Sequence, residues 1–481
     1  MKKKTGLFKI LLFILLGMVL ATWIFSASYY YNNELMDMNM KNVGLFDAFS
    51  LAYSSFGFEY FLNMFLFLLS VGAFYGVLNK TGKYRAWIER IASNCNGREF
   101  AVLILTSFII AVLTAIFDFG VILFIFVPFI ISILLAMGYN KITTIIAVFG
   151  SMLVGTIGNL IGYNTTGVTA QVLSANQTDG FYYKLVLFII AFVIEMLYLS
   201  KAKRTKKDDR KELENDDLFI GEKTSNKYST TPIIVMFIIL GLLVVLACTN
   251  WVDTFKFDFF SKLHSKVMEW NPKLPYLHIT IDGIKTGTAK TDIIAKIFGS
   301  ISEFGKWLHL EMSVVLIIAS LILGKIYKLE SIFEAMADGI KKMLKPALMV
   351  LMCFTVVYFA GMNMFYPTIA KLILSISSKF SVLLSSICTV IGSIFHVDIL
   401  YVANYVTPQL ASVDGSTNTL VLLITQAIYG CTMFVSPTSM LIVFALTYLN
   451  VPYKEWIKKT WKLSLTLFVV SIVVLLVAKF I

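Results

Sequence analysis

The chain has 481 residues, of which 58% are hydrophobic and 15% are charged, and it carries a formal net charge of +12. Its mean hydropathy of +0.79 is far above that of water-soluble domains, so the composition excludes a soluble globular protein. A membrane helix needs about 20 apolar residues, and a chain this long and apolar is therefore predicted to be an all-α polytopic membrane protein with about 10–14 membrane segments.

The apolar stretches predict where these segments lie. The first, near 7–28, follows three lysines and is longer than the apolar core of a secretory signal. We therefore expect residues 1–45 to form a retained transmembrane helix and an outer loop, with the N-terminus in the cytoplasm. Two stretches, 231–250 and 464–481, are predicted to be single transmembrane helices. Further uninterrupted stretches occur near 59–79, 181–200, 308–327 and 346–366.

The polar connections predict orientation. Basic residues gather in short connections near 80–98, 201–211, 341–345 and 454–462, where they mark the cytoplasmic side of a membrane and not a nucleic-acid surface. We expect a cytoplasmic linker at 201–230 and an extracellular cap at 251–307. The five cysteines have no paired spacing, so we expect neither a disulfide framework nor a metal site, and no cofactor.

Two regions 280 residues apart have similar acidic, proline, glycine and hydroxyl residues at matching positions, which predicts an internal duplication. The residues in register are Asp118, Pro128, Gly150 and Thr156 in the first region and Asp398, Pro408, Gly430 and Ser436 in the second. The span at 59–79 is followed by a strongly basic loop and its counterpart at 346–366 by a weakly basic one, so the copies should cross the membrane in opposite senses. We predict inverted transport repeats at 46–200 and 346–463, separated in part by a transmembrane helix and a cytoplasmic amphipathic segment at 308–345.

Each copy places an aspartate inside an apolar run. A carboxylate near the middle of a bilayer costs about 2.5–3.5 kcal/mol on insertion scales, which is tolerated when it faces a cavity, a partner or an ion. Asp118 and Asp398 are therefore candidates to bind a coupling ion or to set the charge of the site; the alternative is a structural acid that caps a half-helix. His396 lies two residues before the second acid and has either a direct role or a packing role.

Each copy also has a polar, glycine-rich or proline-containing interruption where apolar core is expected. A helix broken at mid-depth exposes backbone groups and hydroxyls that bind solutes and cations, although small residues also serve as a packing seam between helices. Pro437 should occupy the first turn of a restarted helix, with Ser436 as its cap. The predicted breaks are marked by Gly155, Gly158, Pro128, Pro408 and Pro437. The predicted substrate-binding residues are Thr156, Asn159, Asn164, Thr165, Ser436, Thr438 and Ser439.

Several segments resemble a known family. They are Leu20-Ala21-Thr22-Trp23-Ile24, the stretch from Gly72 to Gly82, Trp307-Leu308-His309-Leu310-Glu311-Met312, and Ser436-Pro437-Thr438-Ser439 followed by Val451-Pro452-Tyr453-Lys454-Glu455-Trp456. In this order they resemble the anaerobic dicarboxylate carriers of the DcuC and YfcC type, within the ion transporter superfamily. The resemblance implies inverted repeats with re-entrant hairpins and coupling to Na⁺ or H⁺. At Asp118-Phe119-Gly120 and His396-Val397-Asp398 the chain departs from the family pattern, which puts the family's substrate in doubt.

The sequence thus predicts a secondary active transporter, a symporter or exchanger of the cytoplasmic membrane, and not an enzyme. The resemblance implies solutes such as dicarboxylates, amino acids including arginine and ornithine, or other small organic acids. Because the cores hold two aspartates and no centred lysine or arginine, an amino acid is favoured among these over a C4-dicarboxylate or another organic anion. An ion channel and a membrane-embedded enzyme are the alternatives from other classes. The expected partners are a small organic solute, a coupling cation, the lipid bilayer and a second copy of the chain in a homodimer, with no nucleic acid.

Overall fold

In the computed structural model, residues 6–31, 34–38, 43–202, 204, 219, 228–269, 280–281, 284–285 and 301–480 are described. The first part of the chain forms α1 Leu7–Ile24, the strands β1 Ser28–Tyr31 and β2 Glu34–Asp37, α2 Asp47–Phe56, α3 Glu59–Lys80, α4 Tyr84–Asn94, α5 Glu99–Phe117, η1 Gly120–Ile125, α6 Val127–Ala136, α7 Lys141–Ile145, η2 Ile146–Gly150, α8 Ser151–Ile157, η3 Tyr163–Gly167, α9 Val168–Val172 and α10 Phe181–Leu199. The two strands form an antiparallel hairpin.

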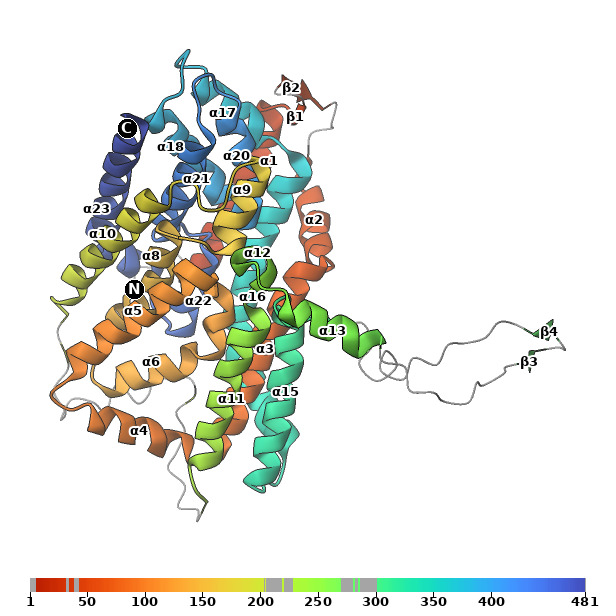
Figure 1. Ribbon diagram of the computed structural model, residues 1–481, viewed down its shortest axis with the longest axis vertical. Helices are drawn as coiled ribbons and strands as arrows, with labels where there is room; N and C mark the ends of the chain where they lie inside the picture. Colours follow the sequence, from red (N-terminus) through yellow and green to blue (C-terminus); the bar gives the residue numbers. More distant parts are fainter. Residues whose placement is uncertain are drawn as a thin grey trace.

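The second part begins with α11 Thr231–Cys248, α12 Trp251–Phe255, α13 Phe259–Glu269 and the short antiparallel pair β3 Thr280–Ile281 and β4 Ile284–Lys285. It continues with α15 His309–Ile326, α16 Ile332–Asn363, α17 Tyr366–Leu374, α18 Val382–His396, α19 Ile399–Tyr405, α20 Thr407–Ala411, α21 Asn418–Met433, α22 Met440–Tyr448 and α23 Tyr453–Phe480. Figure 1 shows these helices as one elongated bundle, with both halves of the chain packed against each other.

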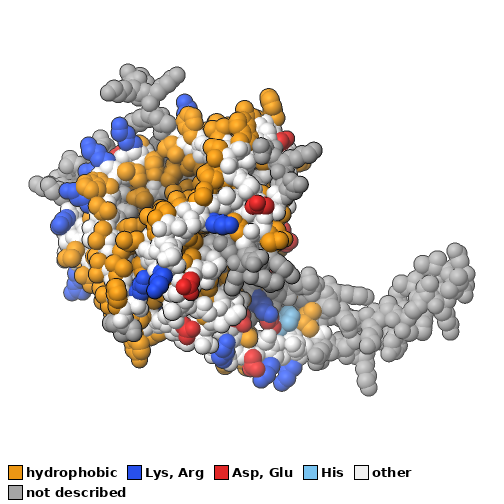
Figure 2. Space-filling view, turned by 90° about the horizontal axis from the view of Figure 1, so that it is seen from above, with side chains coloured by type: hydrophobic (Ala, Val, Ile, Leu, Met, Phe, Trp, Pro, Cys, Tyr) orange, Lys and Arg blue, Asp and Glu red, His pale blue; other side chains and the backbone are white. Residues whose placement is uncertain are grey.

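The described residues contain eight helices that are long and apolar enough to cross a membrane, and four shorter apolar helices of 10–17 residues. Large apolar side chains are exposed on the flanks of the bundle, among them Leu105, Ile238 and Leu465. Figure 2 shows hydrophobic side chains gathered in broad areas along one side of the molecule. A surface of this kind is compatible with lipid and not with water, so the chain is a multi-pass membrane protein.

The two copies have the same order of elements. The series α3, α4, α5, η1, α6, α7–α8, α9 and α10 in the first copy corresponds to α16, α17, α18, α19, α20, α21, α22 and α23 in the second. In Figure 1 the equivalent helices α4 and α17 lie at opposite ends of the bundle, as inverted copies require. The fold is therefore all-α with two inverted repeats.

The first helices of the two copies, α3 and α16, cross at close range through glycines. A Cβ atom at Gly339 would lie 2.0 Å from the carbonyl oxygen of Gly72, and one at Gly76 would lie 2.2 Å from that of Ala335. Without a hydrophobic driving force in lipid, small residues allow helices to approach closely enough for good van der Waals packing. This crossing joins the two halves of the bundle.

Some of the domain boundaries predicted from the sequence fall inside helices or outside the described residues. The boundaries expected at 345/346 and 463/464 fall inside continuous helices, α16 and α23, because charged residues at their ends join the apolar spans without a break. The expected linker at 201–230 lies mostly outside the described residues. So does much of the expected cap at 251–307, of which α12, α13 and the loop before α15 are described.

The two predicted breaks are present. In the first copy the helix ends at Ile157 and helical structure resumes at Tyr163; in the second copy it ends at Met433 and resumes at Met440. Pro128 and Pro408 lie in the first turns of α6 and α20, where a missing amide hydrogen costs nothing.

Two details of the breaks were predicted wrongly. Gly155 lies inside α8 and not at its end, because it allows the helix to pack on the backbone of α5, where a Cβ would lie 2.5 Å from the carbonyl oxygen of Ala111. The restarted helix α22 has Ser439 at its N-cap, so Pro437 precedes it and does not lie in its first turn.

Candidate functional site

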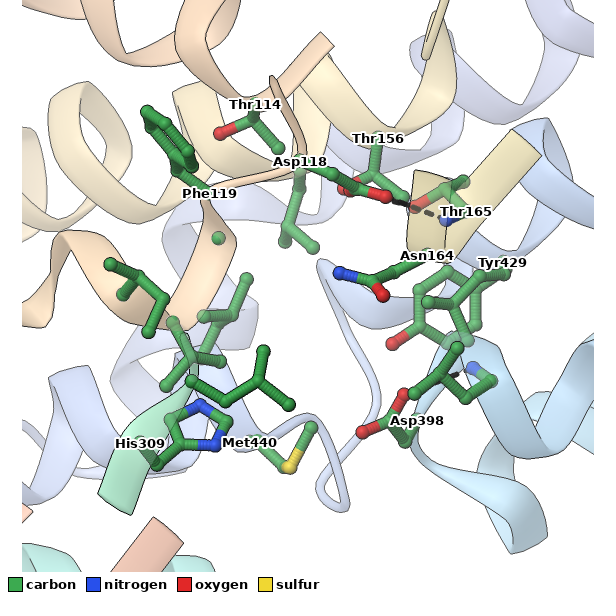
Figure 3. A pocket seen from close by; sticks show the side chains of 18 of the residues that line it. Thr114, Asp118, Phe119, Thr156, Asn164, Thr165, His309, Asp398, Tyr429 and Met440 are labelled. Carbon is green, nitrogen blue, oxygen red and sulfur yellow. Dashed lines mark hydrogen bonds between the residues drawn. The ribbon is translucent and has the colours of Figure 1, made fainter. Parts of the chain in front are cut away.

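A cavity of about 140 Å³ lies between the two copies, where the acids and the first break meet (Figure 3). Five of the residues predicted from the sequence line it: Asp118, Thr156, Asn164, Thr165 and Asp398. The rest of the lining is largely apolar and comes from α3, α5, η1, α8, α19, α21, α22 and the start of α15. The duplication therefore brings two carboxylates to one buried space.

Asp118 ends α5 in the left-handed backbone conformation, with φ 59° and ψ 32°, which aspartate tolerates better than most residues. This turn aims the carboxylate at the restarted helix of its own copy. Its Oδ2 accepts a hydrogen bond from the amide of Thr165 at 2.6 Å, and its Oδ1 accepts one from the Thr165 hydroxyl at 2.9 Å. The carboxylate thus caps the helix that begins after the break, where the backbone amides favour negative charge.

Asp398 caps a helix in the second copy, but it is also bonded to the other half of the molecule. Its Oδ1 accepts from the amide of Leu400 at 3.0 Å, at the start of α19, and its Oδ2 accepts from the hydroxyl of Tyr60, on α3, at 3.0 Å. The preceding Val397 has φ 47°, a strained value for a β-branched residue, and its carbonyl accepts from the Tyr429 hydroxyl at 2.8 Å. The backbone strain is held in place by these bonds.

Asn159 is fully buried behind the cavity and does not line it. Its amide donates to the carbonyl of Thr114 at 3.0 Å, and its Oδ1 accepts from the amide of Gly162 at 2.9 Å and from the hydroxyl of Thr166 at 2.8 Å. Gln426 on α21 donates to the carbonyl of Asn159 at 3.2 Å and accepts from Thr166 at 3.1 Å. The two residues satisfy the backbone that the first break exposes.

The second break places its polar residues beside α18 and not in the cavity lining. The hydroxyl of Thr438 donates to the carbonyl of Ile394 at 2.9 Å and lies 2.7 Å from the hydroxyl of Ser436. Ser439 is buried, and its hydroxyl has no hydrogen-bond partner among the described residues. Of the seven predicted substrate-binding residues, Asn159, Ser436, Thr438 and Ser439 are therefore near the site but do not line it.

His396 is also outside the cavity lining. Its ring stacks on that of Tyr405, with 5.0 Å between centroids and 8° between planes, and meets the edge of Tyr366. Neither ring nitrogen has a hydrogen-bond partner among the described residues. These contacts fit the packing alternative that the sequence left open.

Several cavity residues from distant parts of the chain were not predicted from the sequence, among them Tyr60, His309, Tyr429 and Met440. Tyr60 and Tyr429 had no local signal. His309 belongs to the segment Trp307-Leu308-His309-Leu310-Glu311-Met312, which was noted for its resemblance and not for its chemistry. Among the described lining residues it is the one side chain that can carry positive charge, since no lysine or arginine is present.

The loop that leads to His309 carries an ion pair outside the long apolar helices. Lys306 lies 2.8 Å from Glu303, whose carboxylate also accepts a hydrogen bond from Ser261 on α13. The hydrogen bond from Lys306, then that from Ser261, lower the pKa of Glu303, and the same bond to Glu303 raises the pKa of Lys306. The loop therefore keeps both charges at neutral pH.

A bundle of inverted repeats with two broken helices around a cavity that contains two acids is the architecture of a secondary carrier. The sequence model of the family described as DcuC, C4-dicarboxylate anaerobic carrier, matches residues 5–480, and the chain belongs to this family. It is thus a membrane carrier of small organic solutes. A solved structure, described as the Alcanivorax borkumensis YdaH transporter with an unusual topology, is similar at 13% identity over 97% of this chain and 96% of that one, with a TM-score of 0.39. No curated protein matched the chain.

Proposed function

We propose that the chain is a cation-coupled secondary transporter of the cytoplasmic membrane that moves a small amino acid by alternating access. The observation that carries the proposal is the lining of the cavity, where Asp118 and Asp398 are accompanied by no lysine or arginine among the described residues. Two carboxylates in one cavity, Asp398 buried and Asp118 partly buried, favour a ligand that brings positive charge when no lysine or arginine lies beside them. The ammonium group of an amino acid supplies it.

The size of the cavity limits the solute. An apolar cavity of about 150 Å³ accommodates a molecule such as benzene, and the cavity here measures about 140 Å³. That space suits an amino acid with a short side chain, such as alanine or serine. Arginine and ornithine, which the sequence favoured, would need a wider cavity than this conformation offers.

A C4-dicarboxylate is the second candidate, because the family's description names that class of solute. A dicarboxylate would place two further negative charges beside Asp118 and Asp398, so protons or cations would have to enter with it. The hydroxyls of Thr165 and Thr156 donate to Asp118 and to the carbonyl of Met152, which leaves Asn164 and His309 as polar contacts for a carboxylate.

Coupling to H⁺ or Na⁺, in symport or exchange, is part of the proposal, since acids inside a membrane bundle mark pathways of ions or protons. The basic loops support an N-terminus in the cytoplasm. The apolar flanks of the bundle are also compatible with a homodimer in the membrane.

The test is transport by the purified protein in liposomes. Labelled alanine, serine, arginine and succinate are supplied under a Na⁺ gradient, a pH gradient, or exchange with unlabelled solute inside. We expect saturable uptake of a short amino acid, with competition by its analogues. Uptake of succinate with none of the amino acids would overturn the amino-acid proposal and leave a dicarboxylate carrier; flux that does not saturate and shows no exchange would indicate a channel.

A further inference from the structure

A third acid is buried in the membrane part of the bundle, away from the cavity. Glu195 lies on α10 and is fully buried. Its Oε1 accepts a hydrogen bond from the hydroxyl of Ser151, on α8, at 3.0 Å, and its Oε2 has no hydrogen-bond partner among the described residues. An ionisable side chain in such a place is expensive and generally marks a path for ions or protons.

No described residue supplies a positive charge to this carboxyl group. Helices α5, η2, α8, α21 and α23 pack against α10, and η2 and α8 contain no titratable residue. Glu99 on α5 pairs with Arg204, Cys431 on α21 contacts Ser471, and Lys184 on α10 itself donates to a backbone carbonyl. Near the end of α10 that carries Glu195, the hydroxyl of Tyr198 donates to the carbonyl of Lys459 on α23. The side chains of the basic residues on that part of α23 are exposed: Lys458, Lys459 and Lys462.

The surroundings favour a proton over a metal cation. A hard cation takes several oxygen ligands, and the structure gives this carboxyl one hydroxyl, that of Ser151. A proton needs no further ligands, and a neutral carboxyl group is far less costly in an apolar environment than a carboxylate. The observed contacts of Glu195 therefore match a group that holds a proton.

The second copy shows that the fold does not require an acid at this position. The residue 280 positions later, Leu475 on α23, is also fully buried. The counterpart of Ser151 is Cys431, which contacts Ser471, one turn before Leu475. Each copy thus has one polar contact between the broken helix and the last helix, and only the first copy uses a titratable group for it.

The carboxyl group lies where the two broken helices meet. A Cβ atom at Gly150 would lie 3.0 Å from Oε1 of Glu195 and 3.4 Å from the ring of Phe434. Gly150 ends the π-helical turn η2, and Phe434 is the first residue after α21, at the start of the second break. Turns of this kind occur frequently at functional sites, and movement of either broken helix would change the burial of the carboxyl group.

We infer that Glu195 is the proton-binding site of this carrier: it takes up one proton and releases it when the broken helices rearrange, so that one proton crosses in each cycle. The inference rests on the proposed carrier function, and it assigns the coupling step to a residue outside the solute cavity. The acids of the cavity then remain free to contact the solute.

The test compares Glu195→Gln with the wild type in liposomes. Glutamine keeps the shape and a hydrogen bond to Ser151 but cannot exchange a proton. We expect E195Q to retain solute exchange without a gradient. Accumulation driven by a pH gradient should fall about tenfold, because the variant no longer couples proton binding to solute transport. The exposed Glu59 on α3 provides the matched control, E59Q, which should behave like the wild type in both assays.

A second measurement does not depend on a solute. Infrared spectroscopy of the purified protein should show the band of a protonated carboxyl group that both E195Q and Glu195→Leu lack, the leucine variant reproducing the residue of the second copy. Wild-type accumulation by E195Q under a pH gradient, accumulation driven by Na⁺ alone, or an unchanged infrared band in E195Q would overturn the inference. Failure of the proposed function looks different, since the wild type itself would then exchange no solute.

Discussion

Asp118 and Asp398 occupy equivalent positions in the two copies but have different hydrogen-bond partners. Asp118 is bonded within its own copy, through the backbone and hydroxyl of Thr165. Asp398 is bonded to Leu400 in its own copy and to Tyr60 in the other. The position of the Asp118 carboxylate is therefore set within the first copy, whereas that of Asp398 also depends on how the two halves of the molecule are placed relative to each other.

The same contrast holds for the breaks. In each copy a residue of the break donates to a carbonyl near the end of the helix that leads to the acid: Asn159 to Thr114 on α5 in the first, Thr438 to Ile394 on α18 in the second. The two carbonyls are 280 residues apart, so the duplication extends to individual hydrogen bonds. Beyond that bond, the first break is densely satisfied, and the second retains a buried hydroxyl without a partner at Ser439. The second copy is the less constrained one.

The largest difference should appear at the matched positions of the breaks. Replacement of Asn159 by alanine removes bonds to Thr114, Gly162 and Thr166 and leaves buried groups unsatisfied, at a cost of about 3 kcal/mol. Replacement of Ser439, whose hydroxyl has no partner among the described residues, should cost less than about 0.5 kcal/mol. Apparent melting temperatures in detergent and the folded yield measure both. Equal losses in the two variants would contradict the contrast between the breaks.

The acids themselves should differ next. In Asp118→Asn the new NH₂ group faces either the amide N–H of Thr165, in place of Oδ2, or the side-chain amide of Asn159, whose Nδ2 lies 3.4 Å from Oδ1, so one donor loses its acceptor. Loss of a hydrogen bond to a charged group costs about 1.5–3 kcal/mol. We expect initial uptake to fall by about 100-fold. Asp398→Asn should lower it by about tenfold, because the Tyr60 hydroxyl can rotate to accept from the new amide. Both variants are compared by initial uptake rate per folded transporter in liposomes. A larger fall in Asp398→Asn than in Asp118→Asn would contradict the expected difference between the two acids.

The smallest effects should come from the donors. Thr165→Val keeps the shape of the side chain but removes the hydroxyl bond to Asp118, so the apparent KM for the solute should rise about tenfold. Tyr60→Phe removes the bond to Asp398, whose carboxylate also faces the cavity, and water there can replace it; a rise of about threefold is expected. Concentration series of uptake measure both values. A larger rise in KM in Tyr60→Phe than in Thr165→Val would show that Asp398, and not Asp118, is the more rigidly held acid.

Much of the fold could be predicted because its cause is local. Apolar runs and prolines reveal spans and helix starts from the chain itself, and the repeat was visible because Asp118 and Asp398 stand at equal distances from their prolines. The site was predicted less completely. The first break and the two acids line the cavity, whereas the polar residues of the second break do not. A serine or threonine at a helix break looks the same in sequence whether it faces a cavity or the next helix.

A membrane bundle of two inverted halves with acids and breaks at matched places could be predicted from the amino-acid sequence, because membrane insertion depends on the hydropathy and charge of each short segment. Helix packing was needed to show that Tyr60, His309 and Tyr429 join the aspartates around one cavity, and that Glu195 lies buried beside Ser151 with no basic partner among the described residues. Those contacts depend on helices hundreds of residues apart packing in one register, and that register is set by close contacts such as the one between Gly72 and Gly339.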